Sequence, residues 1–151
     1  MRIFLPLAAP DRAVLETGGR LALAEDRRAW AVTAEAVADR PGEDEEDLEY
    51  DALQDAVHVA LSGVGPQERA LVIAADVPDQ LIEGATEDGG AFGIRLTGEA
   101  SAKIASFHVT ELDAAAAEAD DTDPALLWFD ASEGPAALAY LAGDQSATDS
   151  L

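Results

Sequence analysis

The chain has 151 residues, the size of a single domain, and its 31 acidic against 9 basic side chains give a formal net charge of −22. A field of this sign repels phosphate backbones and anionic headgroups, so neither nucleic acid nor a membrane surface is an expected partner. The absence of cysteine excludes disulfides and thiolate chemistry. No apolar stretch suits a signal peptide or a membrane span, so the cytoplasm is the expected location.

The first half of the chain predicts alternating strands and helices. Its elements in order are a strand over residues 2–7, a helix from Pro10-Asp11 to Glu16, a strand over residues 29–33 and a helix over residues 44–62. The last helix is the most strongly marked. Leu53, Val57 and Leu61 recur at helical spacing, acidic side chains lead into the pattern, and Gly63 ends it.

The second half predicts more strands. Its elements are a strand over residues 70–77, a short helix after Pro78-Asp79, strands over 92–97 and 104–110, a helix over 112–119, a segment over 126–129 that fits strand or helix, and a helix over 136–141. The run over 70–77 is apolar without alternation, which indicates an interior strand covered on both faces. Together the elements predict one α/β or α+β domain over residues 1–142, a mixed sheet flanked by helices, with a flexible tail over 143–151.

Segments of the two halves echo each other in the same order. The pairs are residues 7–11 with 74–79, residues 30–33 with 107–110, and residues 48–52 with 127–131. They raise the hypothesis of two pseudo-repeated βαβα-like halves, residues 1–65 and 66–141, in which Leu5 would match Ile73 and Trp30 would match Phe107. The alternative is chance similarity in an alanine-rich chain whose strands run into Pro-Asp helix starts.

Asp76 and Asp79 lie where an interior strand gives way to a helix. In open α/β sheets, ligands gather at the carboxyl ends of the strands, so Asp76 is a candidate binding or catalytic residue, with Asp79 beside it. The local alternative is that Asp79 caps a helix and Asp76 accepts hydrogen bonds from turn amides. Asp11, which also follows a strand and a proline, has the same two interpretations, as a functional residue or as a local cap.

His108 lies in the middle of a predicted strand, between two apolar residues that would face the core. It could therefore act as a general base in a cleft, or it could be a half-exposed histidine with one hydrogen bond. Asp51, Asp55 and His58 follow one another by about one helical turn, which is ligand spacing but is also typical of a solvated helix face. No metal site and no cofactor are expected from the sequence.

Trp128 and Phe129, next to Asp130, could form an aromatic contact surface or could anchor the core. Glycine-rich phosphate loops and the Gly-x-Ser-x-Gly elbow are absent, and neither Ser101 nor Ser106 has the sequence context of a nucleophile.

Five segments carry a family resemblance that spans residues 1 to about 141: Met-Arg-Ile-Phe-Leu-Pro at 1–6, Leu-Glu-Tyr-Asp-Ala-Leu at 48–53, Val-Ile-Ala-Ala-Asp-Val-Pro-Asp at 72–79, Phe-His-Val-Thr at 107–110 and Leu-Leu-Trp-Phe at 126–129. Together they resemble a family of small uncharacterised actinobacterial proteins. Where its members carry an acidic residue after the His-Val pair, this chain has Thr110 followed by Glu111. The resemblance implies a lineage and no activity.

Two classes of function stay open on the sequence. The first is a non-enzymatic binding or regulatory domain with a basic protein partner, because the chain is acidic and lacks a catalytic motif. The second is a small hydrolase or metal-dependent enzyme that uses Asp76, His108 and nearby carboxylates. An acidic mimic of nucleic acid is a third reading. The charge also has simpler explanations, solubility or a salt-adapted host. The expected state is a monomer or small homo-oligomer.

Overall fold

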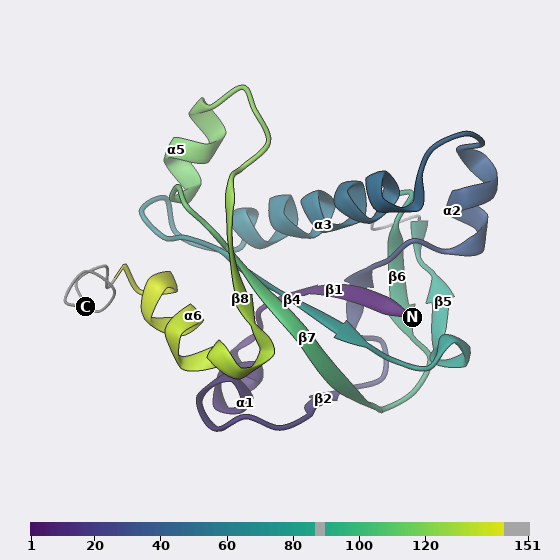
Figure 1. The fold of residues 1–151 in the computed structure, drawn as a ribbon, viewed down its shortest axis with the longest axis horizontal. Coiled ribbons are helices and arrows are strands. Elements are labelled where there is room, and N and C mark those ends of the chain that lie inside the picture. The colour runs from purple at the N-terminus through teal and green to yellow at the C-terminus, as the bar shows by residue number, and fades with distance from the viewer. Residues whose placement is uncertain (87–89, 144–151) are drawn as a thin grey trace.

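A computed structural model describes residues 1–86 and 90–143. In this part of the chain eight strands form one sheet, and helices cover both of its faces (Figure 1). The order across the sheet is β2 (Leu21–Leu23), β7 (Ala100–Thr110), β4 (Leu71–Asp76), β1 (Arg2–Pro6), β3 (Arg28–Trp30), β6 (Gly93–Leu96) and β5 (Ile82–Gly84), with β8 (Leu126–Asp130) paired to β7. Every pairing between these strands is antiparallel.

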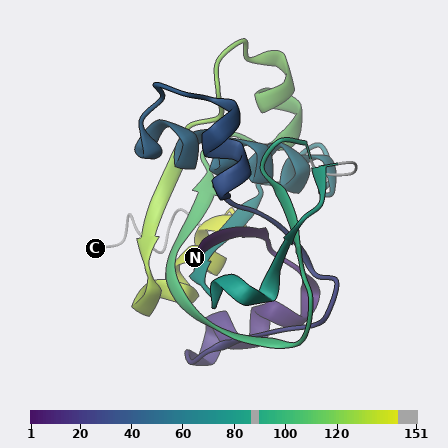
Figure 2. The ribbon, with the colours of Figure 1, turned by 90° about the vertical axis from the view of Figure 1, so that its right-hand side faces the viewer.

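Two hydrophobic cores lie on opposite faces of the sheet. On one face, α3 (Glu45–Ser62) covers Phe4, Val72 and Ala74, with α2 (Ala34–Asp39) at its edge. On the other face, α1 (Arg12–Thr17) and α6 (Gly134–Leu141) cover a larger core that includes Leu5 and Ile73. Figure 2, turned by 90°, shows how the sheet curls between the two layers. Strands β1 and β4 lie centrally in the sheet and are therefore buried on both faces.

The strong helix prediction over 44–62 is confirmed by α3. Acidic residues fill its first turn, where the helix dipole favours negative charge, and its buried side includes Leu48, Ala52 and Val57. The outer side of α3 is mostly polar, with Tyr50 and Val59 as partly exposed exceptions. One amphipathic helix is thus enough to cover this face of the central strands.

The first turn of α6 fits closely against the last turn of α1. A Cβ atom built on Gly134 would lie 2.1 Å from the carbonyl oxygen of Leu15, so only glycine allows this approach. The contact joins two helices that are far apart in the sequence, and together they close the larger core.

The prediction of an α/β domain with one sheet flanked by helices is confirmed, but the expected mixture of strand directions is not found. The apolar, non-alternating runs of β1 and β4 predicted interior strands covered on both faces, and both strands do lie there. Here antiparallel strands carry the same pattern, because helices cover both faces of the sheet.

The other predicted elements are present with shifted bounds, and β2, α2 and β5 are additional to them. The segment over 126–129 is strand β8, and the strand over 104–110 is the second half of the longer β7. A single 3₁₀ turn, η2 (Asp79–Leu81), replaces the helix expected after Pro78-Asp79, because the chain then pairs with β6 as β5. Strand β2 and helix α2 were not predicted; helix α5 (Ala114–Ala119) was. Of the predicted tail over 143–151, all but Gly143 lies outside the described residues.

The proposed duplication is not established by this fold. Leu5 and Ile73 are direct cross-strand partners, and both Pro-Asp segments lie at 3₁₀ turns. However, Trp30 belongs to the core under α3, whereas Phe107 belongs to the opposite core. The third echo pairs part of α3 with β8, a helix with a strand.

Within the described ranges, the search for membrane-spanning helices found none of sufficient length and hydropathy.

Candidate functional site

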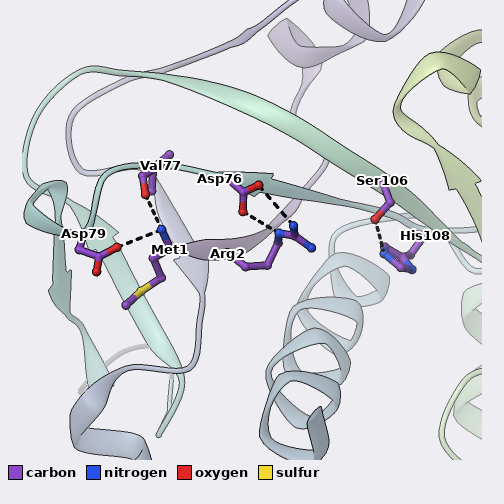
Figure 3. A network of polar contacts seen from close by, with 7 residues as sticks. All are labelled: Met1, Arg2, Asp76, Val77, Asp79, Ser106 and His108. Atoms are coloured by element: carbon purple, nitrogen blue, oxygen red, sulfur yellow. Dashed lines mark hydrogen bonds and ion pairs between the residues drawn. The ribbon is translucent and has the colours of Figure 1, made fainter. Parts of the chain in front are cut away.

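Ser106 and His108 are neighbours on one face of β7, the face that α3 covers. The Ser106 hydroxyl and His108 Nε2 lie 3.0 Å apart, which is a hydrogen bond (Figure 3). Ser106 is only 6% exposed, so a substrate has little access to its hydroxyl. The distance between the two groups is that of a catalytic serine and its base, but the burial of the hydroxyl does not suit a nucleophile.

Burial, with a smaller contribution from the positive charge of Arg2, lowers the pKa of His108 to about 4. The imidazole is therefore neutral at pH 7, and it is a weak base for proton transfer at that pH. These properties favour a structural histidine with one hydrogen bond over a general base.

Asp76 and Asp79 are both engaged within the chain. Asp76 accepts hydrogen bonds from Arg2 Nε at 2.7 Å and from a second Arg2 nitrogen at 3.3 Å, and the hydrogen bond with Arg2 holds the pKa of Asp76 below its usual value. Asp79 forms an ion pair of 3.0 Å with the amino group of Met1, which also donates to the carbonyl oxygen of Val77 (Figure 3). Asp76 thus pairs with a side chain of β1 instead of the turn amides considered from the sequence.

The structure places Asp76 and His108 on adjacent strands but not in one site. In the β4–β7 ladder, His108 lies opposite Val72, and Asp76 lies opposite Lys103. Four residues along β4 therefore separate the two positions, a distance of about 13 Å at the usual rise per residue. A shallow hollow near Arg2 is lined by Met1, Val32, Glu45, Glu49 and Asp79, and by neither Asp76 nor His108.

Trp128 is the most exposed of the large apolar side chains in the described part of the chain, at 60%. It lies on β8 opposite His108 and therefore on the α3 side of the sheet. Leu127, on the other side of β8, is 38% exposed, while Phe129 is buried and packs near Tyr140. Of the two aromatics weighed from the sequence, Phe129 is part of the core and Trp128 is largely exposed.

The loop that leads into β8 is fastened to α3 by two hydrogen bonds. The hydroxyl group of Tyr50 donates to Asp123 Oδ2 at 3.2 Å, and Gln54 Nε2 donates to the carbonyl oxygen of Pro124 at 3.4 Å. Tyr50 is 47% exposed. The position of β8 beside β7 is thus supported from α3, and Tyr50 adds a second aromatic ring to this side of the molecule.

One feature of this region was missed from the sequence although it is visible there. All nine basic side chains lie between Arg2 and Lys103, and none follows. The eight acidic residues of the described segment 104–143 are Glu111, Asp113, Glu118, Asp120, Asp121, Asp123, Asp130 and Glu133. Counting net charge over the whole chain hid this asymmetry; counting it per segment reveals it.

No group of three His, Asp or Glu side chains in residues 1–86 and 90–143 is arranged to hold a metal ion. Asp51, Asp55 and His58 share the outer side of α3 without forming such a group. Burial raises the pKa of Asp55. In this fold, the one-turn spacing of Asp51, Asp55 and His58 reflects their shared place on the outer side of a helix.

The resemblance to an uncharacterised family is confirmed by a family model that matches residues 1–138. The actinobacterial origin stays a prediction. No curated protein and no solved structure matches the chain. Because the match covers most of its length, the chain belongs to DUF6912, a family of unknown function.

Proposed function

We propose that this domain is a non-enzymatic binding module that recognises a basic segment of a partner protein, with Trp128 at the centre of the contact. The observation that carries the proposal is that Trp128 is 60% exposed on a strand held in place on two sides. Strand β8 pairs with β7, and the loop before it is hydrogen-bonded to α3. Tryptophan is among the residues most enriched at the energetic centres of protein interfaces. Fixed in place, its ring offers a large apolar area at little entropic cost.

Charge supports a basic partner. The segment that carries Trp128 has no lysine or arginine. Asp123 lies in the loop that leads into β8, and Asp130 is the last residue of that strand. Such a surface attracts cationic side chains and repels anionic ones. The same reasoning disfavours nucleic acid and anionic membranes as partners. We place the domain in the cytoplasm, as a monomer or small homo-oligomer.

The hydrolase alternative has less support. It would require Asp76 and His108 to converge on a substrate, and about 13 Å of sheet separates them. The pKa of His108, at about 4, and the ion pair between Asp76 and Arg2 leave neither side chain suited to proton transfer at neutral pH.

The test is selection of a phage-displayed library of random peptides on the full-length protein, followed by titration of selected peptides. Two tryptophans are present, and Trp30 is only 4% exposed, so fluorescence changes on titration report mainly on Trp128. We expect peptides rich in lysine or arginine, with affinity that falls as salt rises.

Trp128→Ala lacks the fluorescent reporter, so its affinity and that of the wild type are compared by isothermal titration calorimetry. The variant should weaken binding at least about tenfold, as truncation of a central interface residue does. Val59→Ala is the matched control, because Val59 is 44% exposed on α3 and should leave affinity unchanged. Selection of neutral or acidic peptides, equal binding by Trp128→Ala, or no selection at all would each contradict the proposal.

A further inference from the structure

The edge of β8 that faces away from β7 has no strand partner in the described part of the chain. Strand β7 lies between β4 and β8 along residues 106–109, so β8 ends the sheet on this side. Exposed edges are templates for another strand, and proteins usually protect them with charge, proline or a covering element. Here the exposed edge carries Leu127 and Trp128 instead. Resting on the function proposed above, we infer that the basic segment binds in extended form as an additional strand along this edge.

The hydrogen-bond pattern shows which backbone groups are available. The Glu111 amide donates to the carbonyl oxygen of Ala125 at 3.0 Å, which makes these residues a hydrogen-bonded pair in the β7–β8 register. Pairs alternate along an antiparallel ladder, so Leu127 and Phe129 also bond to β7. Trp128 lies between them in a non-hydrogen-bonded pair with His108. Its own N–H and C=O therefore point away from β7, toward the position of an added strand.

The available edge has a defined end. The amide of Asp130 donates to Glu133 Oε1 at 2.9 Å, within the turn η3 (Ala131–Glu133) that follows β8. The usable backbone groups are thus those of Leu126 and Trp128. An added strand would bond to both residues and stop before Asp130.

Side chains on both faces of β8 suit an added strand. Trp128 lies on the α3 side of the sheet and Leu127 on the α6 side, and both are partly exposed. Alternate side chains of an extended segment would cover one of them on each face. Backbone bonds would supply affinity that depends little on sequence, and these two contacts would supply selectivity.

Charge identifies the occupant as a basic segment. A second copy of this chain, joined through the same edge, would bring Asp123 and Asp130 of one molecule close to those of the other, with no lysine or arginine in the segment to compensate. Like charges placed together at an edge oppose pairing. A cationic extended segment would instead find a negative charge near each end of β8, Asp123 before the strand and Asp130 at its end.

The experiment compares a selected peptide with a series in which one backbone amide at a time is N-methylated. A strand uses every second amide toward its neighbour, so methylation should weaken binding by at least about tenfold at alternate positions and by less than about threefold between them. In parallel, amide exchange of the protein is followed by NMR. The Trp128 amide should become protected on binding, whereas the Leu127 and Phe129 amides are protected already.

The outcomes separate the two proposals. Binding that requires Trp128 but tolerates methylation everywhere, or leaves the Trp128 amide unprotected, would overturn strand addition and leave the binding function intact. Binding that does not require Trp128 would overturn both. If the free protein dimerises in sedimentation equilibrium, with the Trp128 amide already protected, the occupant is a second copy and the inference of a basic segment is wrong.

Discussion

The chain uses its charges in two different ways on either side of Lys103. Up to that residue, acids and cations meet within the protein: Asp11 with Arg27, Asp76 with Arg2, and Glu83 with Arg95. In the described part of the chain, no acidic residue that follows Lys103 belongs to an ion pair. The ion pairs before Lys103 thus join parts of the fold to one another, while the acids of the described segment after it carry no such pair. The difference explains why Asp76, attractive in sequence, is less promising than the region around Trp128.

The strongest test of the internal use of charge is Asp11→Ala. Asp11 is 2% exposed, and it accepts hydrogen bonds from Arg27 at 2.8 Å and from the Ala8 amide at 2.9 Å. Its removal leaves Arg27, 19% exposed, without its carboxylate, so we expect a loss of about 3 kcal/mol in the free energy of unfolding. Urea denaturation measures this loss.

Asp79→Ala is the matched control, since Asp79 is 77% exposed in its ion pair with the Met1 amino group. We expect a change below about 1 kcal/mol, the usual value of a surface pair. Equal losses in the two variants would show that burial does not separate scaffold charges from surface charges in this protein.

An intermediate effect is expected from His108, which lies opposite Trp128 in the β7–β8 ladder. Its pKa is about 4 in the folded protein and near 6.5 when unfolded, so the unfolded state binds more protons between these values. Stability from the neutral imidazole is present above pH 6.5 and is lost as the pH falls toward 4. Between pH 7 and pH 5 the loss is about 2 kcal/mol.

Acidification also reduces repulsion among the carboxylates, so the wild type must be compared with His108→Asn. On going from pH 7 to pH 5, the wild type should lose about 2 kcal/mol more unfolding free energy than His108→Asn does. His58→Asn is the control, because His58 is exposed on α3, and it should behave like the wild type. Identical pH dependence in all three proteins would show that His108 is not buried in its neutral form.

The smallest effect is expected for Asp76→Asn. The side chains of Arg2 and Asp76 are 41% and 44% exposed, and surface ion pairs contribute about 1 kcal/mol or less. Peptide affinity should not change, because Asp76 lies on the far side of β7 from β8. A large loss of binding in this variant, with stability preserved, would move the binding surface away from β8.

Much of the fold could be predicted because its main elements carry their own local signals. The acidic first turn and the leucine and valine spacing of α3 are properties of that segment alone, as is the apolar run of β4. Strands β2 and β5, of three residues each, have no such pattern and form only because β7 and β6 offer them edges. Strand direction depends on distant partners, so the apolar runs could not specify it.

The candidate site was predicted in part. Trp128 was named from its residue type, but its exposure depends on β8 ending the sheet, which is a property of the whole topology. Asp76 was named from its place at the end of a strand, and its pairing with Arg2 could not be foreseen because 74 positions separate the two residues in sequence. The lack of cations after Lys103 needed no structure at all.

The close fit of Gly134 against Leu15 bears on how the molecule acquires its structure. Two helices more than a hundred residues apart must meet before the larger core is closed, and the central strands β1 and β4 are themselves about 70 residues apart. Loops of this length close slowly, so folding times of milliseconds to seconds are expected, in place of the microseconds of helical bundles. During synthesis, the faces of β7 and β8 that α6 covers would stay exposed until residues 134–141 have left the ribosome. For most of that time the nascent chain would depend on its negative charge to keep exposed apolar surface from aggregating.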